Sequence, residues 1–227
     1  MTDLEVRQLV GQGAFGAGGD EPYARALRTD GRLRLTDPAH PDDAISYDVG
    51  RWNAAADAVD RSLLESADGP VIDIGCGPGR MLVAAGMLGI PALGVDVSPV
   101  AVAIARNAGG RAVRGSVFEP VPDEGRWDTA LVIDGNIGIG GDPAALLARC
   151  RDIVRANGRI IVEAHCVPDA DRTYRARIVD ESGRTSEEFP WAEVGREAII
   201  RHAGAVGLTH RATWSAEART FCELVAG

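Results

Sequence analysis

Residues 73 to 79 read Asp-Ile-Gly-Cys-Gly-Pro-Gly, an acid followed by glycines at alternate positions. Glycine has no side chain that would hold a ligand away, and it adopts the backbone angles of a tight turn at little cost. The apolar positions at 71–74 predict a short buried strand, and residues 80–88 predict a helix. The first turn of that helix would present unpaired amide N–H groups to negatively charged or carboxylate-bearing ligands. The segment therefore predicts a strand, turn and helix that bind a nucleotide.

A second acid, Asp96, ends the strand predicted at 91–96. Ser98 and Pro99 follow it as an N-cap and a first-turn proline for a helix at 100–107. In a nucleotide-binding α/β fold, an acid at this position accepts hydrogen bonds from both ribose hydroxyls. Asp96 is therefore the predicted sugar ligand.

The spacing of the glycines distinguishes between nucleotide-binding families. The dinucleotide fingerprint is Gly-x-Gly-x-x-Gly, whereas here the third glycine comes one residue earlier. Asp73-x-Gly75-x-Gly77-x-Gly79 resembles the first motif of the class I S-adenosylmethionine-dependent methyltransferases. The resemblance implies the cofactor S-adenosylmethionine, its product S-adenosylhomocysteine, and an Asp73 that lies under the methionine ammonium. The implied cofactor contacts are Asp73, Gly75, Cys76, Gly77, Gly79, Asp96, Val97, Ser116, Val117, Asp134, Asn136 and Ile137.

Three further positions at strand ends carry chemistry. By the resemblance, Ser116 stands where many relatives carry an acid that accepts the adenine amino hydrogen, and a serine hydroxyl can accept the same bond. Asp134 and Asn136 follow the next predicted strand, and we expect them to flank the methionine or methyl end of the cofactor. His165 follows a further strand and is either a general base or an ordinary loop or packing histidine.

The elements that must position these residues alternate between strand and helix. The further expected elements are strands at 111–115, 129–133 and 159–163 and a helix that begins at Asp142-Pro143 and ends near Val154. Such alternation predicts right-handed crossovers and a parallel sheet. Two final strands, at 208–214 and 220–225, are joined by a short turn and must be antiparallel to each other. The expected fold class is α/β, a Rossmann-like, mostly parallel seven-stranded sheet with helices on both faces, an antiparallel C-terminal strand and a small N-terminal cap.

Residues 1–53 precede this pattern and are predicted to form an N-terminal extension or lid, with the cofactor-binding domain at 54–227. The glycine-rich residues 11–19 are either a mobile lead-in or a flap over a ligand. The other elements expected here are helices at 4–10 and 23–27, the latter begun by Asp20-Glu21-Pro22, and an edge strand around Leu33 and Leu35.

Two aromatic residues and an arginine, Tyr47, Trp52 and Arg51, stand just before a helix predicted at 54–66. In the methyltransferase family this region often closes over the cofactor and shapes the substrate pocket. The three side chains are therefore candidates for substrate binding. The alternative is that Tyr47 and Trp52 are packing residues.

Residues 168–191 interrupt the alternation. Strands predicted at 174–179 and 184–189 flank a turn that contains glycine, and a helix is predicted at 192–206. This hairpin is either an insertion that shapes the substrate site or an ordinary surface excursion.

Composition excludes several classes of partner. All 24 basic residues are arginines and the net charge is −9, which argues against a nucleic-acid backbone as the main partner. The four cysteines have neither the spacing of a zinc site nor that of a disulfide framework, so we expect no metal and a reducing, cytoplasmic location. Neither a signal peptide nor a membrane span is predicted. The oligomeric state stays open.

The sequence thus predicts a methyltransferase acting on a small-molecule substrate, with an oxygen, nitrogen or carbon nucleophile. Alignment of the nucleophile with the methyl group can lower the barrier by about 7–11 kcal/mol, so a dedicated catalytic residue is not required. Two alternatives remain open. A nicotinamide-dependent oxidoreductase shares the glycine turn and the ribose acid, and a non-catalytic regulator could bind the cofactor without turnover.

Overall fold

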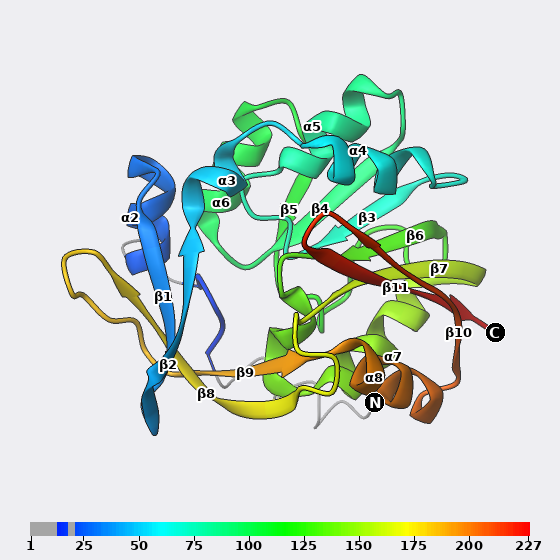
Figure 1. The fold of residues 1–227 in the computed structure, drawn as a ribbon. Helices are drawn as coiled ribbons and strands as arrows, with labels where there is room; N and C mark the ends of the chain where they lie inside the picture. Colours follow the sequence, from blue (N-terminus) through cyan, green and yellow to red (C-terminus); the bar gives the residue numbers. More distant parts are fainter. Residues whose placement is uncertain (1–12, 18–20) are drawn as a thin grey trace.

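The structure is a computed structural model that describes residues 13–17 and 21–227. It consists of two β-sheets with helices packed around the larger one (Figure 1). The helix predicted at 4–10 lies outside the described residues, as does Asp20. The helix predicted at 23–27 is present as α2 (Pro22–Thr29), with Pro22 in its first turn.

The larger sheet has seven strands. Their order is β10 (Leu208–Ala216), β11 (Arg219–Ala226), β7 (Val154–Ala164), β6 (Trp127–Val132), β3 (Val71–Ile74), β4 (Ala92–Asp96) and β5 (Ala112–Arg114). The pairs from β7 to β5 are parallel, whereas β11 is antiparallel to both β7 and β10. The predicted fold class and the antiparallel C-terminal strand are confirmed.

Helices cover both faces of this sheet because successive strand residues point to opposite sides. Ile72 and Val132 belong to a core cluster shared with α7 (Pro143–Ile153) and α8 (Arg196–Ala205). Their neighbours Val71 and Leu131 belong to a second cluster, shared with α4 (Ala58–Glu65) and α5 (Arg80–Met87). Figure 1 shows α4 and α5 above the sheet and α7 and α8 below it.

The connection after β4 follows the predicted local chemistry. Ser98 accepts a hydrogen bond from the amide of Ala101 (3.3 Å) and Pro99 begins α6 (Pro99–Asn107). The two residues therefore start the helix as an N-cap and a first-turn proline do elsewhere. This cap holds α6 beside the C-terminal end of β4, where Asp96 lies.

The smaller sheet has four antiparallel strands. Their order is β2 (His40–Asp48), β1 (Arg32–Asp37), β8 (Asp171–Asp180) and β9 (Phe189–Val194). Leu35 of β1 pairs with Ile45 on one side and with Ile178 on the other. The prediction of an edge strand around Leu33 and Leu35 was wrong, because β8 arrives from far along the chain and covers the second edge of β1. The sheet joins the N-terminal extension to the 168–191 insertion.

The hairpin also has a different register from the predicted one. Its second strand is β9 rather than residues 184–189, and α8 begins at Arg196 rather than at 192. Phe189 and Trp191 are buried and pair with Ala176 and Tyr174, so burial of the two large rings sets the register. The hairpin is thus not a surface excursion.

The helix predicted at 54–66 is present as α4 (Ala58–Glu65), and a separate short helix, α3 (Val49–Asn53), precedes it. Asp48 caps α3, and Asp57 caps α4. Asp57 and Asp60 form a reciprocal capping box, in which each side chain accepts a hydrogen bond from the backbone amide of the other. The helix therefore begins later than the apolar pattern suggested.

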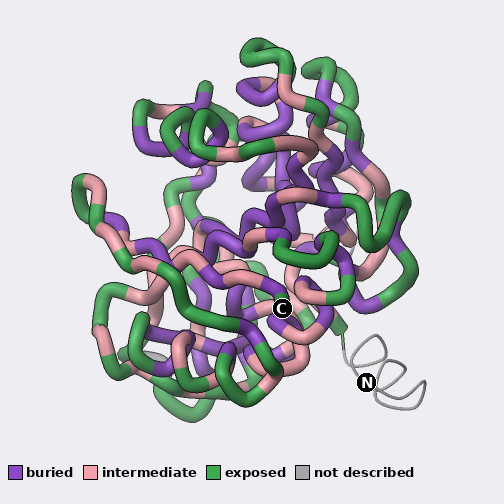
Figure 2. The backbone as a smooth tube through the Cα atoms, turned by 90° about the vertical axis from the view of Figure 1, so that its right-hand side faces the viewer, coloured by how far each residue is buried: buried purple, intermediate pink, exposed green. Residues whose placement is uncertain are grey.

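Figure 2 shows that exposed residues gather in the outer turns and loops, while buried residues run through the interior. Within the described residues, no helix combines the length and the apolar composition needed to cross a lipid bilayer. The helix predicted to end near Val154 is α7, which ends at Ile153, and β7 begins directly after it.

Candidate active site

A cavity of about 550 Å³ lies at the carboxyl ends of β3 to β6. The segments after these strands form one wall. The opposite wall comes from residues 13–17, α2, β2, α3 and β9. The two sheets therefore face each other across a single cavity, at the end of a parallel sheet where ligands bind in α/β folds.

Most of the sequence-predicted site residues line this cavity. They are Tyr47, Trp52, Gly75, Cys76, Gly77, Asp96, Val97, Ser116, Val117, Asp134 and Asn136. Five others do not line it: Arg51, Asp73, Gly79, Ile137 and His165.

The turn after β3 brings its backbone against the cavity. Gly75 and Gly77 have φ angles of +71° and +54°, in the left-handed region that glycine adopts without strain. Asn136 supports the turn, because its amide nitrogen donates to the carbonyls of Ile74 and Gly75 (2.9 Å each). A Cβ atom on Gly75 would lie 2.7 Å from the same amide nitrogen. The turn thus requires glycine at this position, and Asn136 holds it.

The third glycine has a different task. A Cβ atom on Gly79, whose φ is +90°, would lie 2.7 Å from the Cβ of Ala105 in α6. Gly79 therefore permits the close packing of the start of α5 against α6. The structure assigns it to helix packing, not to the cavity lining that the motif suggested.

Asp96 lines the cavity at the end of β4. Its two carboxylate oxygens accept hydrogen bonds from the backbone amides of Gly77 and Ser98, each at 2.8 Å. Burial raises its pKa to about 6, although these two amides act in the opposite direction. A carboxylate oxygen can accept more than one hydrogen bond, so Asp96 keeps capacity for donors from a ligand.

Asp73 lies at the end of β3 and does not line the cavity. Its side chain is buried, and its Oδ1 atom has no hydrogen-bond partner among the described residues. Burial is the main cause that raises its pKa to about 7, and the nearby charge of Arg80 opposes the shift. A carboxyl of this kind changes its protonation near neutral pH.

Asp134 follows β6 and adopts a left-handed backbone, with φ +56°, which is uncommon outside glycine. Its amide donates to Oε2 of Glu163 (2.8 Å) and its carboxylate accepts from Arg80 (2.6 Å). These two contacts hold Asp134 at the cavity wall in a conformation that would otherwise be unfavourable.

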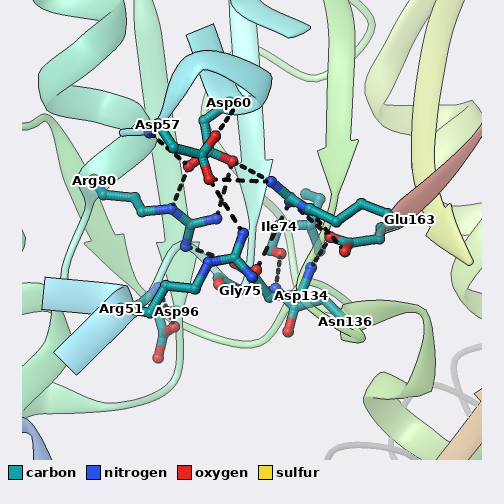
Figure 3. A network of polar contacts seen from close by, with 12 residues as sticks. Arg51, Asp57, Asp60, Ile74, Gly75, Arg80, Asp96, Asp134, Asn136 and Glu163 are labelled. Carbon is teal, nitrogen blue, oxygen red and sulfur yellow. Dashed lines mark hydrogen bonds and ion pairs between the residues drawn. The ribbon is translucent and has the colours of Figure 1, made fainter. Parts of the chain in front are cut away.

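Behind Asp134 lies a buried network of charges, drawn in Figure 3. Arg80 donates to both oxygens of Asp60, at 2.8 and 3.2 Å. Arg219, from the last strand, donates to Asp60 (2.7 Å) and to Glu163 (2.9 and 2.8 Å). Burial would raise the pKa of Asp60, but the two arginines outweigh it and lower the pKa to about 2. The network ties α4, α5, β6, β7 and β11 together beneath the cavity.

The adenine position predicted from the sequence lies beside β5. Ser116 accepts a hydrogen bond from the amide of Phe118 (3.2 Å), and its own amide donates to Glu119 (3.2 Å). Glu119 and Arg114 line the cavity at this end. Glu119 therefore supplies an acid three residues after Ser116, the position where many family members carry one.

The end of the cavity beside β6 is aromatic. The rings of Tyr47 and Trp52 lie 5.3 Å apart between centroids, tilted by 40°, and the ring of Tyr23 approaches Trp52 at 5.9 Å. Phe15 lies 5.6 Å from Trp191. The glycine-rich stretch therefore contributes residues 13–15 and 17 to the cavity wall, and Tyr47 and Trp52 both pack and line the cavity.

His165 does not reach the cavity. It forms an isolated β-bridge with Gly195, and its Nδ1 atom accepts a hydrogen bond from the amide of Val167 (3.2 Å). Arg51 is exposed and pairs with Asp57 at 3.5 Å. Ile137 is buried in the core beside α7. These three residues were predicted at the site, but the structure does not bring them together there.

Sequence reasoning missed several residues of the cavity and its support: Phe15, Tyr23, Arg80, Glu163, Trp191 and Arg219. Arg80 directly follows the glycine motif, and its position there was the available signal. The others come from distant segments, and no local pattern marks them. In residues 13–17 and 21–227, no group of three or more His, Cys, Asp or Glu side chains is arranged so that it could hold a metal ion.

A comparison with protein families matches residues 47–218 to a methyltransferase-domain model. No curated protein matches the chain significantly. The match covers the glycine turn, Asp96, Asp134 and every strand of the large sheet except β11. It ends at residue 218, and β11 begins at the next residue.

Solved structures of low sequence identity share the fold. An S-adenosylmethionine-dependent methyltransferase from Bacteroides fragilis, in complex with S-adenosyl-L-homocysteine, is 17% identical, with 95% of this chain and 98% of that chain covered and a TM-score of 0.77. The 1,6-didemethyltoxoflavin-N1-methyltransferase of Burkholderia thailandensis is 20% identical, with 79% and 83% covered and a TM-score of 0.56. An amino pentose methyltransferase from Micromonospora echinaspora is 14% identical, with 79% and 95% covered and a TM-score of 0.58.

Proposed function

The chain belongs to the methyltransferase-domain family, and on that premise we propose that it transfers a methyl group from S-adenosylmethionine to a small-molecule acceptor. The observation that carries the proposal is the single cavity that joins the glycine turn and Asp96 to an aromatic end built by the second sheet. One end suits a nucleoside, and the other leaves room for a second ligand.

The residues of the cavity fit the cofactor. Asp96, already oriented by two backbone amides, has the capacity to accept the ribose hydroxyls. Gly75 and Gly77 present bare backbone to the ligand, and a side chain on either would point toward Asn136 or Tyr23. Ser116, Val117 and Glu119 are suited to the adenine. When bound, the cofactor supplies an electrophilic methyl group attached to a positively charged sulfur.

The acidic residues fit the positive charges of that cofactor. Asp134 lines the cavity, with Glu163 and Asp60 directly behind it. Asp73 is buried at the end of β3 and does not line the cavity, and we assign it to the local negative potential instead of direct contact with the ligand. Gly79 and Ile137 have positioning roles, through the α5 and α6 contact and through the core.

No dedicated general base is included in the proposal. His165 is bonded to the chain's own backbone outside the cavity, and the Cys76 thiol has a pKa raised above its ordinary value by burial. Orientation of the acceptor by the cavity wall, with water excluded, accounts for about 7–11 kcal/mol of barrier lowering in well-aligned reactions. The structurally similar enzymes named above include methyltransferases of a toxoflavin precursor and of an amino pentose, which supports a small-molecule acceptor.

The division of the chain into a lid at 1–53 and a cofactor-binding domain at 54–227, with a hairpin insertion near 168–191, is part of the proposal. It is supported by the four-stranded sheet, which these two outlying segments form together. We also propose a cytoplasmic location, since the four cysteines are free thiols and three of them are buried. The acidic net charge of −9 supports a partner that is not a nucleic acid.

Isothermal titration of the purified protein with S-adenosylhomocysteine and with NAD⁺ tests the proposal against an oxidoreductase. We expect saturable binding of S-adenosylhomocysteine only. Gly77→Val should abolish it, since the added side chain points at Tyr23 and the residue has φ +54°. Gly125→Val is the matched control, because Gly125 has φ +73° with no atom near its Cβ position. Binding of NAD⁺ alone would contradict the proposal.

A non-catalytic regulator is the remaining alternative. Transfer of a labelled methyl group from S-adenosylmethionine to members of a panel of small amines, phenols and heterocycles distinguishes it from an enzyme. Binding with no transfer to any acceptor, including those in a cell extract depleted of macromolecules, would favour the regulator.

A further inference from the structure

The aromatic residues of this protein are concentrated in one place. The chain has only four tryptophans, three tyrosines and four phenylalanines. Six of these eleven form one network of ring contacts with centroid distances of 4.9–6.3 Å: Phe15, Tyr23, Tyr47, Trp52, Phe189 and Trp191. The rings come from five separate elements or segments, so no single helix or strand requires them for its own packing.

Five of the six rings line the cavity, and only Phe189 does not. Phe15, Tyr47 and Trp52 are half-buried. Ile139 and Pro190 add apolar surface beside them. Aromatic faces and edges favour another flat ring over a flexible polar chain. This end of the cavity therefore selects for a planar ligand.

The charge around these rings is negative. Burial and the carboxylates of Glu193, Asp134 and Glu163 raise the pKa of the Tyr47 hydroxyl above its ordinary value. The Tyr23 hydroxyl lies beside Gly77 at the nucleoside end, where burial and Asp96 raise its pKa. Burial is the first cause of both shifts, and the carboxylates that face each phenol add to it.

Arg80 and Arg219 offset this charge only in part, because between them they face three carboxylates, those of Asp60, Asp134 and Glu163. Arg80 donates to both Asp60 and Asp134. Arg114 lies on β5, beside Ser116 and away from β6 in the strand order. Arg51, which the sequence suggested for the cavity mouth, pairs with Asp57. A carboxylate or phosphate on the acceptor would thus face Asp134, and Arg80, which lines the cavity beside it, already donates to Asp60 and Asp134; the contact is therefore unfavourable.

We propose that the acceptor is a flat aromatic molecule without negative charge, held against Tyr47, Trp52 and Trp191 while its reactive atom faces Asp134. The inference rests on the proposed function, because it names the substrate class of the same cavity. It excludes aromatic acids and phosphorylated metabolites as acceptors. It includes aromatic amines and nitrogen heterocycles, whether neutral or protonated.

Two flat probes of similar shape but different charge test the proposal: 6-aminoquinoline, which has no negative charge, and quinoline-6-carboxylate, which has one. Each is titrated into the protein loaded with S-adenosylhomocysteine, and the dissociation constant is measured by saturation-transfer NMR. We expect the amine to bind about tenfold more tightly than the carboxylate, the scale of one unfavourable charge contact in a partly buried site.

Variants locate the binding to the rings. Trp52→Leu and Trp191→Leu should each weaken binding of the amine about threefold to tenfold, the loss of one ring contact. Trp214→Leu is the control, because Trp214 stacks on Phe221 in the C-terminal hairpin, outside the cavity. Since Trp191 is buried, the half-buried Trp52 provides the variant that retains the fold, and binding of S-adenosylhomocysteine to each variant verifies this.

The outcomes separate the two proposals. If S-adenosylhomocysteine does not bind, the proposed function fails. If it binds but the carboxylate binds as tightly as the amine, or the amine does not bind saturably, the acceptor class is wrong and the proposed function stands. Unchanged binding in both Trp52→Leu and Trp191→Leu would also overturn the acceptor class.

Discussion

The two sheets meet the same cavity from opposite sides and are built in different ways. In the seven-stranded sheet, β3 pairs in parallel with β4, the next strand along the chain, and a helix connects the two. In the four-stranded sheet, β1 pairs with β8, and Thr36 bonds to Arg177 across 141 positions of sequence. One wall is assembled from successive units, and the other exists only after two distant segments meet.

Under the proposed function, the large sheet would bind the cofactor and the small sheet would bind the acceptor. The glycine turn, Asp96 and the charged network all belong to the large sheet and its connections. Tyr47 and Trp191 belong to the small sheet. A change in the small sheet should therefore alter the acceptor end of the cavity and leave the nucleoside end in place, whereas a change in the charged network should affect both.

The largest expected effect comes from removing a charge of the buried network. Arg219→Met leaves Asp60 and Glu163 buried with fewer partners, which should lower the free energy of unfolding by about 3–5 kcal/mol. Urea unfolding followed by circular dichroism measures it. Arg211→Met, which breaks an exposed pair with Glu223, is the control and should cost less than about 1 kcal/mol. Equal losses in both variants would show that the network does not hold the large sheet.

Truncation of a core side chain in the small sheet should have a smaller and more local effect on stability. Leu35→Ala removes a fully buried side chain between β2 and β8, at a cost of about 2–5 kcal/mol. Hydrogen exchange should accelerate more in β1 and β8 than in β3 and β6. Leu88→Ala, at a 40% exposed position, provides the baseline. Uniform acceleration over both sheets would mean that they unfold together and would break the proposed separation.

The nucleoside end is tested by Asp96→Ala. Loss of hydrogen bonds to a charged group should reduce the affinity for S-adenosylhomocysteine by about 1–3 kcal/mol, measured by titration calorimetry. Asp152→Ala removes a carboxylate that is paired with Arg151 on the surface, and should leave the affinity unchanged. An unchanged dissociation constant in Asp96→Ala would remove Asp96 from the cofactor site.

The smallest expected effect concerns the pH dependence of stability. Because the pKa of Asp73 is raised from 3.8 to about 7, the folded state binds this proton more tightly than the unfolded state does. The contribution of this carboxyl to stability is therefore fully present below about pH 4 and declines as the pH rises through 7.

Asp73→Asn should remove that slope. The melting temperature of the variant relative to the unmodified protein should rise between pH 5 and pH 8 by at least about 2–4 °C, the equivalent of ~1 kcal/mol in a protein of this size. Asp60, with a pKa of about 2, does not titrate in this window. A constant difference between the two proteins would show that Asp73 is ionised throughout and paired in a way the structure does not contain.

The sequence alone determined the large sheet and its ligand-binding end. Short-range patterns sufficed, because each parallel strand is a buried apolar run next to a helix with its own cap, such as Ser98-Pro99. The glycines and Asp96 are constrained by local backbone geometry, so their types and spacing predicted the nucleoside end of the cavity and the family. The motif predicted Gly79 as a cofactor contact. In the structure its lack of a side chain lets α5 pack against Ala105 of α6, and the sequence does not show how two helices pack.

The tertiary structure decided the acceptor end. The pairing of β1 with β8 and the approach of Phe15 to Trp191 depend on residues more than 100 positions apart. The same holds for Arg219, which reaches Asp60 from the last strand. Contacts of this kind are selected by burial of large side chains and by neutralisation of buried charge in the folded molecule. Neither leaves a periodic trace in the sequence, so only the folded chain shows which rings and charges meet at the end of the cavity that we propose for the acceptor.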